Sequence, residues 1–177
     1  FPVYGLAECS VALTFPPLER GIKIDKIERE AFEKKLHAIP TTSTHHTLEF
    51  VGCGVALNKH KIRVVDNKNH ILPDRHIGNL QFSGPSAMQG YYRNNQATEA
   101  AYHDGWWDTG DLAYLVQGEV FITGRKKDII IKAGRNIHPE EIEHVMQNIV
   151  VLHYQKQSSL HYQSAVQATL LNQRSWH

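Results

Sequence analysis

One acidic and one basic residue form a pair that could bind a ligand with vicinal hydroxyls and a phosphate. Asp111 ends the stretch Gly-Trp-Trp-Asp-Thr-Gly-Asp, and Arg125 opens a basic cluster 14 residues later. A carboxylate accepts hydrogen bonds from neighbouring hydroxyls, and a guanidinium is a permanently charged fork that suits ribose and phosphate oxygens. The spacing predicts two adjacent tight turns that present these groups. The structural alternative is a turn-stabilising aspartate and a solvated arginine.

The elements that must position this pair are expected to be mainly strands. Apolar alternation between turn residues predicts strands at residues 9–15, 49–57, 61–66, 77–83, 112–116, 119–123 and 128–132. Gly52 and Gly54 predict a bulge or a close backbone approach. Gln117-Gly118 predicts the turn of a hairpin. Residues 48–123 therefore resemble a small antiparallel barrel or sandwich.

Three helices are also predicted. The first covers residues 25–38, where Asp25 and Glu28 fit a variant of the capping box. A short one is expected at 95–103. Another begins at 138, because Pro suits the first helical position and acidic residues suit the positive end of the helix dipole. The region after about residue 127 is therefore expected to start a separate α+β unit.

Composition excludes several classes of protein. The 177 residues are 41% apolar and 21% charged, with a net charge of +1. These are the values of a globular chain, and they give no electrostatic argument for a nucleic-acid or membrane partner. Cys9 and Cys53 are too few for a disulfide framework, and the twelve histidines show no metal-ligand spacing. We expect a cytoplasmic protein with reduced thiols, no membrane span and no bound nucleic acid.

Four motifs occur in order along the chain. They are Tyr4-Gly5-Leu6-Ala7-Glu8, Gly84-Pro85 with Gly90-Tyr91-Tyr92, Gly105 to Asp111, and Gly124-Arg125-Lys126-Lys127-Asp128 followed by Gly134, Asn136, Ile137, Pro139 and Glu140 to Glu143. Together they resemble the adenylate-forming superfamily of acyl-CoA synthetases, fatty-acyl-AMP ligases, luciferases and peptide-synthetase adenylation domains. The resemblance covers residues 1 to about 146. The inserted segment 16–54, and Ala7 where acyl-CoA synthetases more often have Thr, resemble the fatty-acyl-AMP ligases.

The resemblance implies a fold and a division of the chain. The fold would be α/β, mixed and β-rich, with residues 1–126 as the C-terminal part of the AMP-binding (adenylation) domain and its small antiparallel β-barrel. Residues 127–146 would be the hinge and the start of the small α+β C-terminal domain. The tail 147–177 is atypical, since no Asp or Glu follows Glu143 and no Gly or Pro follows Pro139. Two explanations are open: the tail is one long helix-like segment, or it is a truncated or frame-altered sequence. We favour the second.

The same resemblance assigns roles around the nucleotide. Asp111 and Arg125 would bind ribose and phosphate, and Glu8 would be a ligand of Mg²⁺. Tyr4 would lie against adenine, and Gly5 would allow the close approach that an adenine site needs. Without the family context, Glu8 is an ordinary turn residue and Tyr4 a core tyrosine.

Three further positions follow from the resemblance. Ala7 lies in the ATP- and AMP-binding motif but has no hydroxyl, so a phosphate contact there would be absent or supplied by backbone N–H groups. Lys127 would be the hinge of the C-terminal domain, although it could be a plain surface lysine. Gly134 would lie near a pantetheine arm, and it suits a turn in either case.

The residue that would assist adenylation is not found in this chain. Relatives place a lysine after a glycine near the C-terminus, but no Gly-Lys dipeptide occurs here and no lysine follows Lys156. No catalytic residue is therefore assigned, and the isolated chain is expected to be inactive. The expected function is that of a fragment of an ATP- and Mg²⁺-dependent ligase that activates a carboxylate, by resemblance a fatty acid, as acyl-AMP for acyl carrier protein or CoA. The alternatives are a non-catalytic nucleotide-binding or interaction module and an unrelated β-rich module.

Overall fold

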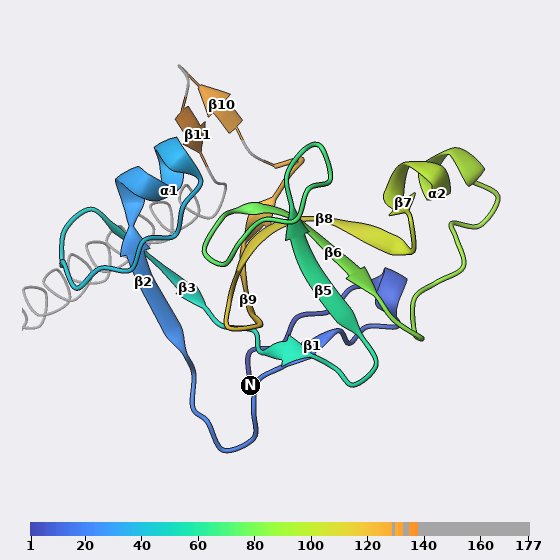
Figure 1. Cartoon of the computed structure of the whole chain (residues 1–177), viewed down its shortest axis with the longest axis horizontal. Coiled ribbons are helices and arrows are strands. Elements are labelled where there is room, and N and C mark those ends of the chain that lie inside the picture. Colours follow the sequence, from blue (N-terminus) through green and yellow to red (C-terminus); the bar gives the residue numbers. More distant parts are fainter. Residues whose placement is uncertain (129, 133–134, 138–177) are drawn as a thin grey trace, which may run out of the picture. The chain divides into compact units, whose positions relative to one another are not determined.

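Antiparallel strands dominate the computed structural model, which describes residues 1–128, 130–132 and 135–137 (Figure 1). These residues lie in one compact unit, Phe1–Ile137. The strands are β1 (Thr14–Phe15), β2 (Ile24–Glu28), β3 (Thr47–Val51), β4 (Val55–Ala56), β5 (Lys61–Val65), β6 (Gly78–Ser83), β7 (Tyr102–His103), β8 (Trp106–Val116), β9 (Glu119–Arg125), β10 (Ile130–Lys132) and β11 (Arg135–Ile137). The helices are α1 (Arg29–Lys35), α2 (Asn95–Ala101) and the 3₁₀ helix η1 (Ala7–Cys9).

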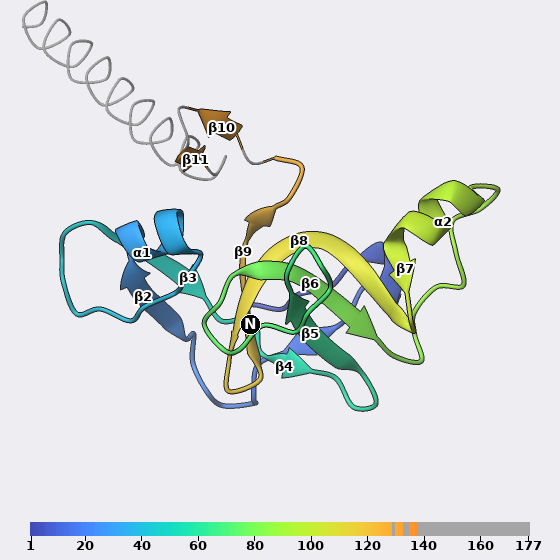
Figure 2. The same cartoon turned by 45° about the horizontal axis from the view of Figure 1, so that its top comes forward.

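The main sheet is organised around β8. Its strand order is β5-β6-β8-β7, and β9 also pairs with β8. β6 runs along one edge of β8, whereas β7 and β9 share the other edge. β7 pairs with Trp106 and Trp107, and β9 begins to pair at Asp111. Residues 108–110 therefore have no strand partner on that edge, and the long arch of β8 spans the gap (Figure 2).

The hairpin that joins β8 to β9 confirms the prediction. Gln117 and Gly118 connect the strands with φ angles of 53° and 78°. Two successive positive φ values match the right-handed twist of the flanking strands. Tyr114 and Phe121 pair across the hairpin, with their rings stacked at a centroid distance of 5.0 Å.

The helix predicted over residues 25–38 is wrong in its first turn and after Lys35. Residues 24–28 form β2, which pairs with β3, and only α1 is helical. Ile27 is fully buried opposite Leu48, where β2 pairs with β3. Asp25, expected as a helix cap, instead accepts hydrogen bonds from Arg75 and from the Tyr114 hydroxyl. Tertiary contacts override a local capping signal here.

The other predictions differ mainly in length. The strand expected at 9–15 is reduced to β1, and the one at 49–57 is divided into β3 and β4 around the two glycines. Gly54 has a φ of 86°, and a Cβ there would lie 1.9 Å from the Phe15 carbonyl carbon. This confirms the predicted close approach. The helix expected at 95–103 ends at Ala101. The turn at Ala133-Gly134 and the helix from residue 138 lie outside the described residues.

Apolar side chains cover both faces of the main sheet. One cluster joins the sheet to the β2–α1–β3 segment and contains Ile27, Phe32, Ala38, Ile77, Tyr114 and Phe121. Two clusters on the other face receive the N-terminal segment, and Tyr4 packs against both of them. The segment 4–14 is thus fixed against the sheet that carries Asp111. Within the described part of the chain, no helix is long and apolar enough to cross a membrane.

Candidate functional site

The described structure brings Tyr4, Asp111 and Arg125 together. The Tyr4 hydroxyl donates to Asp111 Oδ2 at 2.6 Å, and Arg125 Nε lies 3.3 Å from Asp111 Oδ1. The Asp111 residue is only 8% exposed, whereas the Arg125 side chain is 72% exposed. A buried carboxylate is therefore fixed from one side by a phenol and approached from the solvent side by a guanidinium.

The two functional groups are not presented by two separate turns as the sequence predicts. Asp111 and Arg125 face each other as partners in the antiparallel pair β8–β9. Directly opposed side chains in such a pair have neighbouring Cβ atoms. The 14 residues between them are the arms and the turn of one hairpin, and the hairpin register itself creates the pair.

A bulge in β8 turns Asp111 toward Tyr4. Asn79 pairs with Leu112 and Gln81 with Asp108, so three residues of β8 stand opposite Leu80. Gly110 has a φ of 75°, which glycine adopts without strain. The Thr109 hydroxyl donates to the Leu80 carbonyl oxygen at 2.9 Å and accepts from the Asp111 N–H at 3.1 Å. The Thr-Gly-Asp sequence thus builds a bulge that satisfies its own backbone groups.

Tyr4 is held by backbone pairing as well as by its hydroxyl. It forms an isolated bridge with Thr14, whose N–H donates to the Tyr4 carbonyl oxygen at 2.9 Å. Burial and the hydrogen bond to Asp111 raise the pKa of Tyr4 well above its usual range. The phenol therefore remains a donor to Asp111 throughout the neutral range. The predicted stacking on adenine stays a prediction, and the observed partner of the hydroxyl is Asp111.

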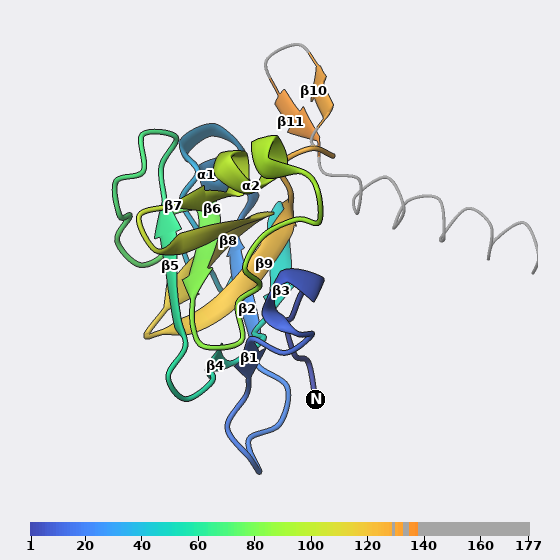
Figure 3. The same ribbon diagram turned by 90° about the vertical axis from the view of Figure 1, so that its right-hand side faces the viewer.

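Glu8 takes part in a different set of contacts. It lies in η1, and its Oε1 accepts from the Tyr91 hydroxyl at 2.8 Å. Its carbonyl oxygen accepts from the Met88 N–H, also at 2.8 Å. Burial and the Glu8 hydrogen bond raise the pKa of Tyr91, so that this phenol also stays protonated. Figure 3, which looks from the α2 side, shows η1 and α2 toward the viewer.

Glycine is required at position 5 by the packing of the chain itself, independently of any ligand. A Cβ at this position would lie 1.5 Å from the Val11 carbonyl oxygen. Only glycine fits against a backbone this close. Ala7 and Lys127 are exposed, and Gly134 lies outside the described residues. The roles predicted for these positions stay predictions.

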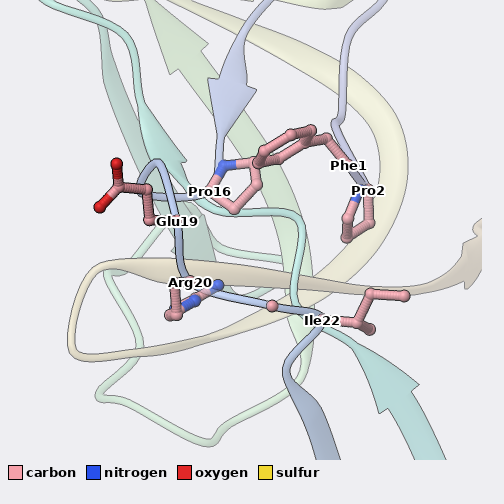
Figure 4. Close-up of a pocket in the computed structure, with 7 residues that line it drawn as sticks. Phe1, Pro2, Pro16, Glu19, Arg20 and Ile22 are labelled. Atoms are coloured by element: carbon pink, nitrogen blue, oxygen red, sulfur yellow. The ribbon is translucent and has the colours of Figure 1, made fainter.

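A cavity of about 280 Å³ lies elsewhere in the chain. It is lined by Phe1, Pro2, Pro16 and residues 19–22 (Figure 4). The Glu19 carboxylate points away from the apolar side chains. A ligand site normally has polar groups that converge on it, so this cavity is not a candidate site, and none of the predicted residues lines it.

Comparison with known proteins gives relatives of one kind. No protein-family model matches the chain. A candidate acyl-CoA synthetase of Caulobacter vibrioides is 37% identical over 147 residues, which are 82% of this chain and 26% of that protein. A medium-chain-fatty-acid–acyl-carrier-protein ligase of Moorena producens is 30% identical over 155 residues, 81% of this chain and 26% of that protein. A 2-succinylbenzoate–CoA ligase of Bacillus velezensis is 38% identical over 107 residues, 59% of this chain and 22% of that protein.

Solved structures show the same likeness. One belongs to a study of fatty acyl-adenylate ligases from E. coli and L. pneumophila; it has a TM-score of 0.76 and 37% identity, over 82% of this chain and 26% of that one. An adenylation domain of a keto acid-selecting peptide synthetase module, bound to keto acyl adenylate, has a TM-score of 0.67 and 36% identity, over 82% of this chain and 27% of that one. The matched part of this chain is homologous to the adenylate-forming ligases. The predicted family and the β-rich fold are confirmed.

The chain spans about a quarter of the length of the relatives it matches. It therefore has the fold of one part of those proteins, the C-terminal part of the adenylating domain. The domain boundaries predicted at residues 126 and 146 stay predictions.

The predicted Mg²⁺ ligand, the Glu8 carboxylate, can be compared with what such a cation needs. Among the described residues there is no group of three His, Cys, Asp or Glu side chains suited to a metal ion. Mg²⁺ at a nucleotide site commonly takes one or two carboxylates and receives its other ligands from phosphates and water. A single carboxylate such as that of Glu8 therefore fits a cation whose other ligands come from a nucleotide and water.

Two residues near the site were not predicted from the sequence. Thr109 builds the bulge under Asp111, and Tyr91 binds Glu8. Each lies inside a motif that resembles the adenylate-forming ligases, and membership in that motif was the only sequence signal that could have identified it. Their partners, however, are 29 and 83 residues away in the sequence.

Proposed function

We propose that this chain forms the ribose side of an adenylate site in an ATP-dependent acyl ligase. The parent reaction would join a carboxylate to AMP, with release of pyrophosphate, and would then pass the acyl group to a pantetheine thiol. The observation that carries the proposal is the buried Asp111 carboxylate between Tyr4 and the exposed Arg125. Oδ1 faces the exposed Arg125, so a ribose diol can replace or join Arg125 there without disturbing the Tyr4 bond.

Each residue of this chain then has a binding or positioning role. Asp111 would accept hydrogen bonds from the ribose hydroxyls, and Tyr4 would hold its carboxylate in one orientation. Arg125, released from Oδ1, would pair with ribose or phosphate oxygens. When bound, a magnesium ion would offset phosphate charge, and Glu8 would be its protein ligand. Such a site acts by positioning and charge stabilisation rather than through a covalent enzyme intermediate.

Four predicted positions would serve the nucleotide motif and the second half-reaction. Gly5 and Ala7 would keep the backbone of the Glu8 turn close to the nucleotide. Lys127 follows the last residues of β9 and would be the hinge for the C-terminal domain. Gly134 would approach the pantetheine arm.

A fatty acid is the proposed carboxylate. Support comes from the fatty-acid–acyl-carrier-protein ligase of Moorena producens and from the fatty acyl-adenylate ligase structure, which are 30% and 37% identical over the matched residues. The 2-succinylbenzoate–CoA ligase shows that this sequence pattern also serves other acids and a CoA acceptor. Acyl carrier protein or CoA is accordingly proposed as the acceptor, and the cytoplasm as the location.

Binding of a non-hydrolysable acyl-adenylate mimic tests the proposal. Isothermal titration of the 177-residue chain should detect binding, and Asp111→Asn should weaken it at least about tenfold, because a hydrogen bond to a charged group contributes about 1.5–3 kcal/mol. Asp104→Asn is the matched control, since Asp104 is exposed in a turn. Equal affinities for the wild type and Asp111→Asn would contradict the proposal.

The second candidate function is a nucleotide-binding module without catalysis. The residues described at this site, Tyr4, Asp111 and Arg125, have binding or positioning roles that both functions would use. An ATP–pyrophosphate exchange assay separates the two functions. For this chain we expect binding of the mimic without acid-dependent exchange, and robust exchange would show that adenylation does not need the missing lysine.

A further inference from the structure

Tyr91 contacts Glu8 through a single, well-placed hydrogen bond. Its hydroxyl donates to Oε1 of Glu8 at 2.8 Å. Among the described residues, no hydrogen bond or ion pair is recorded to the second oxygen, Oε2. One oxygen of this carboxylate is therefore occupied by the protein, and the other is free to face a ligand.

The tyrosine is itself fixed at both ends. Its N–H donates to the Thr98 hydroxyl of α2 at 2.9 Å, and Thr98 in turn donates to the Asn94 carbonyl oxygen at 3.0 Å. The ring meets Trp107 edge-on at a centroid distance of 6.5 Å. These backbone and ring contacts place the Tyr91 hydroxyl beside the Glu8 carboxylate.

The backbone of the Glu8 turn is tied to the same loop. The Met88 N–H donates to the Glu8 carbonyl oxygen at 2.8 Å, and the Ser86 hydroxyl lies 3.1 Å from the thiol of buried Cys9. His60 Nε2 contacts the same Ser86 hydroxyl at 2.7 Å. The segment 84–91 therefore fixes Glu8 through its main chain and through its carboxylate.

We propose that Tyr91 is a positioning residue that orients Glu8 so that Oε2 binds the divalent cation of a nucleotide. This inference rests on the proposed function. A phenol suits the task because it is a neutral donor that leaves the carboxylate its full negative charge. A lysine or arginine in its place would pair with Glu8 and repel the cation. Tyr91 itself would touch neither nucleotide nor metal.

The magnesium-dependent part of nucleotide affinity tests this role. The probe is a non-hydrolysable ATP analogue titrated into the 177-residue chain, once with excess Mg²⁺ and once with EDTA. Tyr91→Phe keeps the ring and removes only the hydroxyl. It should weaken the magnesium complex about five- to tenfold, less than the loss of a direct hydrogen bond to a charged group, because the lost bond orients Glu8 and does not touch the ligand. The affinity measured in EDTA should change less than twofold.

Two other variants separate positioning from a general loss of structure. Tyr92→Phe is the matched control, because Tyr92 is 85% exposed and its recorded side-chain neighbour is Arg93. It should behave like the wild type under both conditions. Glu8→Gln should remove most of the magnesium preference, and in that background Tyr91→Phe should have no further effect. A structural role alone would weaken binding equally with and without magnesium.

The outcomes distinguish this inference from the function it rests on. If the acyl-adenylate mimic binds but Tyr91→Phe leaves the magnesium dependence unchanged, the positioning role is wrong and the proposed function stands. If Tyr91→Phe weakens binding equally in EDTA, Tyr91 is only structural. If neither the mimic nor the ATP analogue binds the wild-type chain, both proposals fail.

Discussion

At the scale of single residues, the hydrogen bond between Tyr4 and Asp111 should contribute both to the free energy of unfolding and to ligand binding. Tyr4→Phe removes the donor and leaves Asp111, 8% exposed, without its phenol partner. The free energy of unfolding should fall by about 1–3 kcal/mol, the cost of an unsatisfied buried group. Urea unfolding at pH 7 measures this loss, and isothermal titration should show weaker binding of the acyl-adenylate mimic.

The pH dependence of this variant has a definite sign. Because the pKa of Tyr4 is raised in the folded chain by burial and by Asp111, the Tyr4 bond contributes its full stability below the unfolded pKa of about 10. That contribution is lost as the pH rises further toward the folded pKa. The difference between wild type and Tyr4→Phe should thus be constant near neutrality and shrink in strong alkali. A difference that grows with pH would contradict this assignment. Tyr92→Phe, an exposed tyrosine, should change stability by less than about 0.5 kcal/mol.

At the scale of elements, the bulge in β8 determines where Asp111 points. Thr109→Val keeps the β-branched shape and removes the hydroxyl, so the carbonyl oxygen of fully buried Leu80 loses its donor. We expect a loss of about 1–3 kcal/mol in the free energy of unfolding and weaker binding of the mimic. Thr109→Ser restores the hydroxyl and should recover most of both. If the serine variant fails as the valine variant does, the methyl group of Thr109, and not its hydroxyl, supports the bulge.

The same elements show what could be predicted from the sequence. The β8–β9 hairpin was predictable because its turn residues are adjacent and need positive φ angles. Asp111 and Arg125 were predicted as a pair, but not as cross-strand partners, since their register depends on a shift in the β8–β9 pairing between Leu112 and Ala113. Asp25 was misassigned to a helix cap because its partner Arg75 lies 50 residues away. Local sequence patterns identified the residues, but contacts with residues far away in the sequence determine their geometry.

At the scale of the whole described unit, ion pairs join the segment after Pro16 to the main sheet. Glu119 of β9, with a side chain 4% exposed, accepts from Arg20 Nη1 at 2.8 Å and from Lys23 at 2.9 Å. Asp25 of β2 is bound by Arg75 and by the Tyr114 hydroxyl. These contacts lie at the face of the sheet opposite Tyr4, so they should govern stability more than ligand binding.

The loss of folding free energy at acidic pH should therefore depend on Glu119. The Arg20 hydrogen bond, with help from Lys23, holds the pKa of Glu119 below its usual range. A lowered folded pKa contributes stability above the unfolded value of about 4.3, and the contribution is lost as the pH falls through the folded pKa. Glu119→Gln should cost about 2 kcal/mol at pH 7, and the gap to the wild type should narrow toward pH 4 and below. Glu30→Gln is the matched control, because Glu30 pairs with Lys34 but is 76% exposed. Urea unfolding across this pH range would contradict the assignment if the Glu119 gap stayed constant, since a constant gap would mean that packing rather than charge is lost.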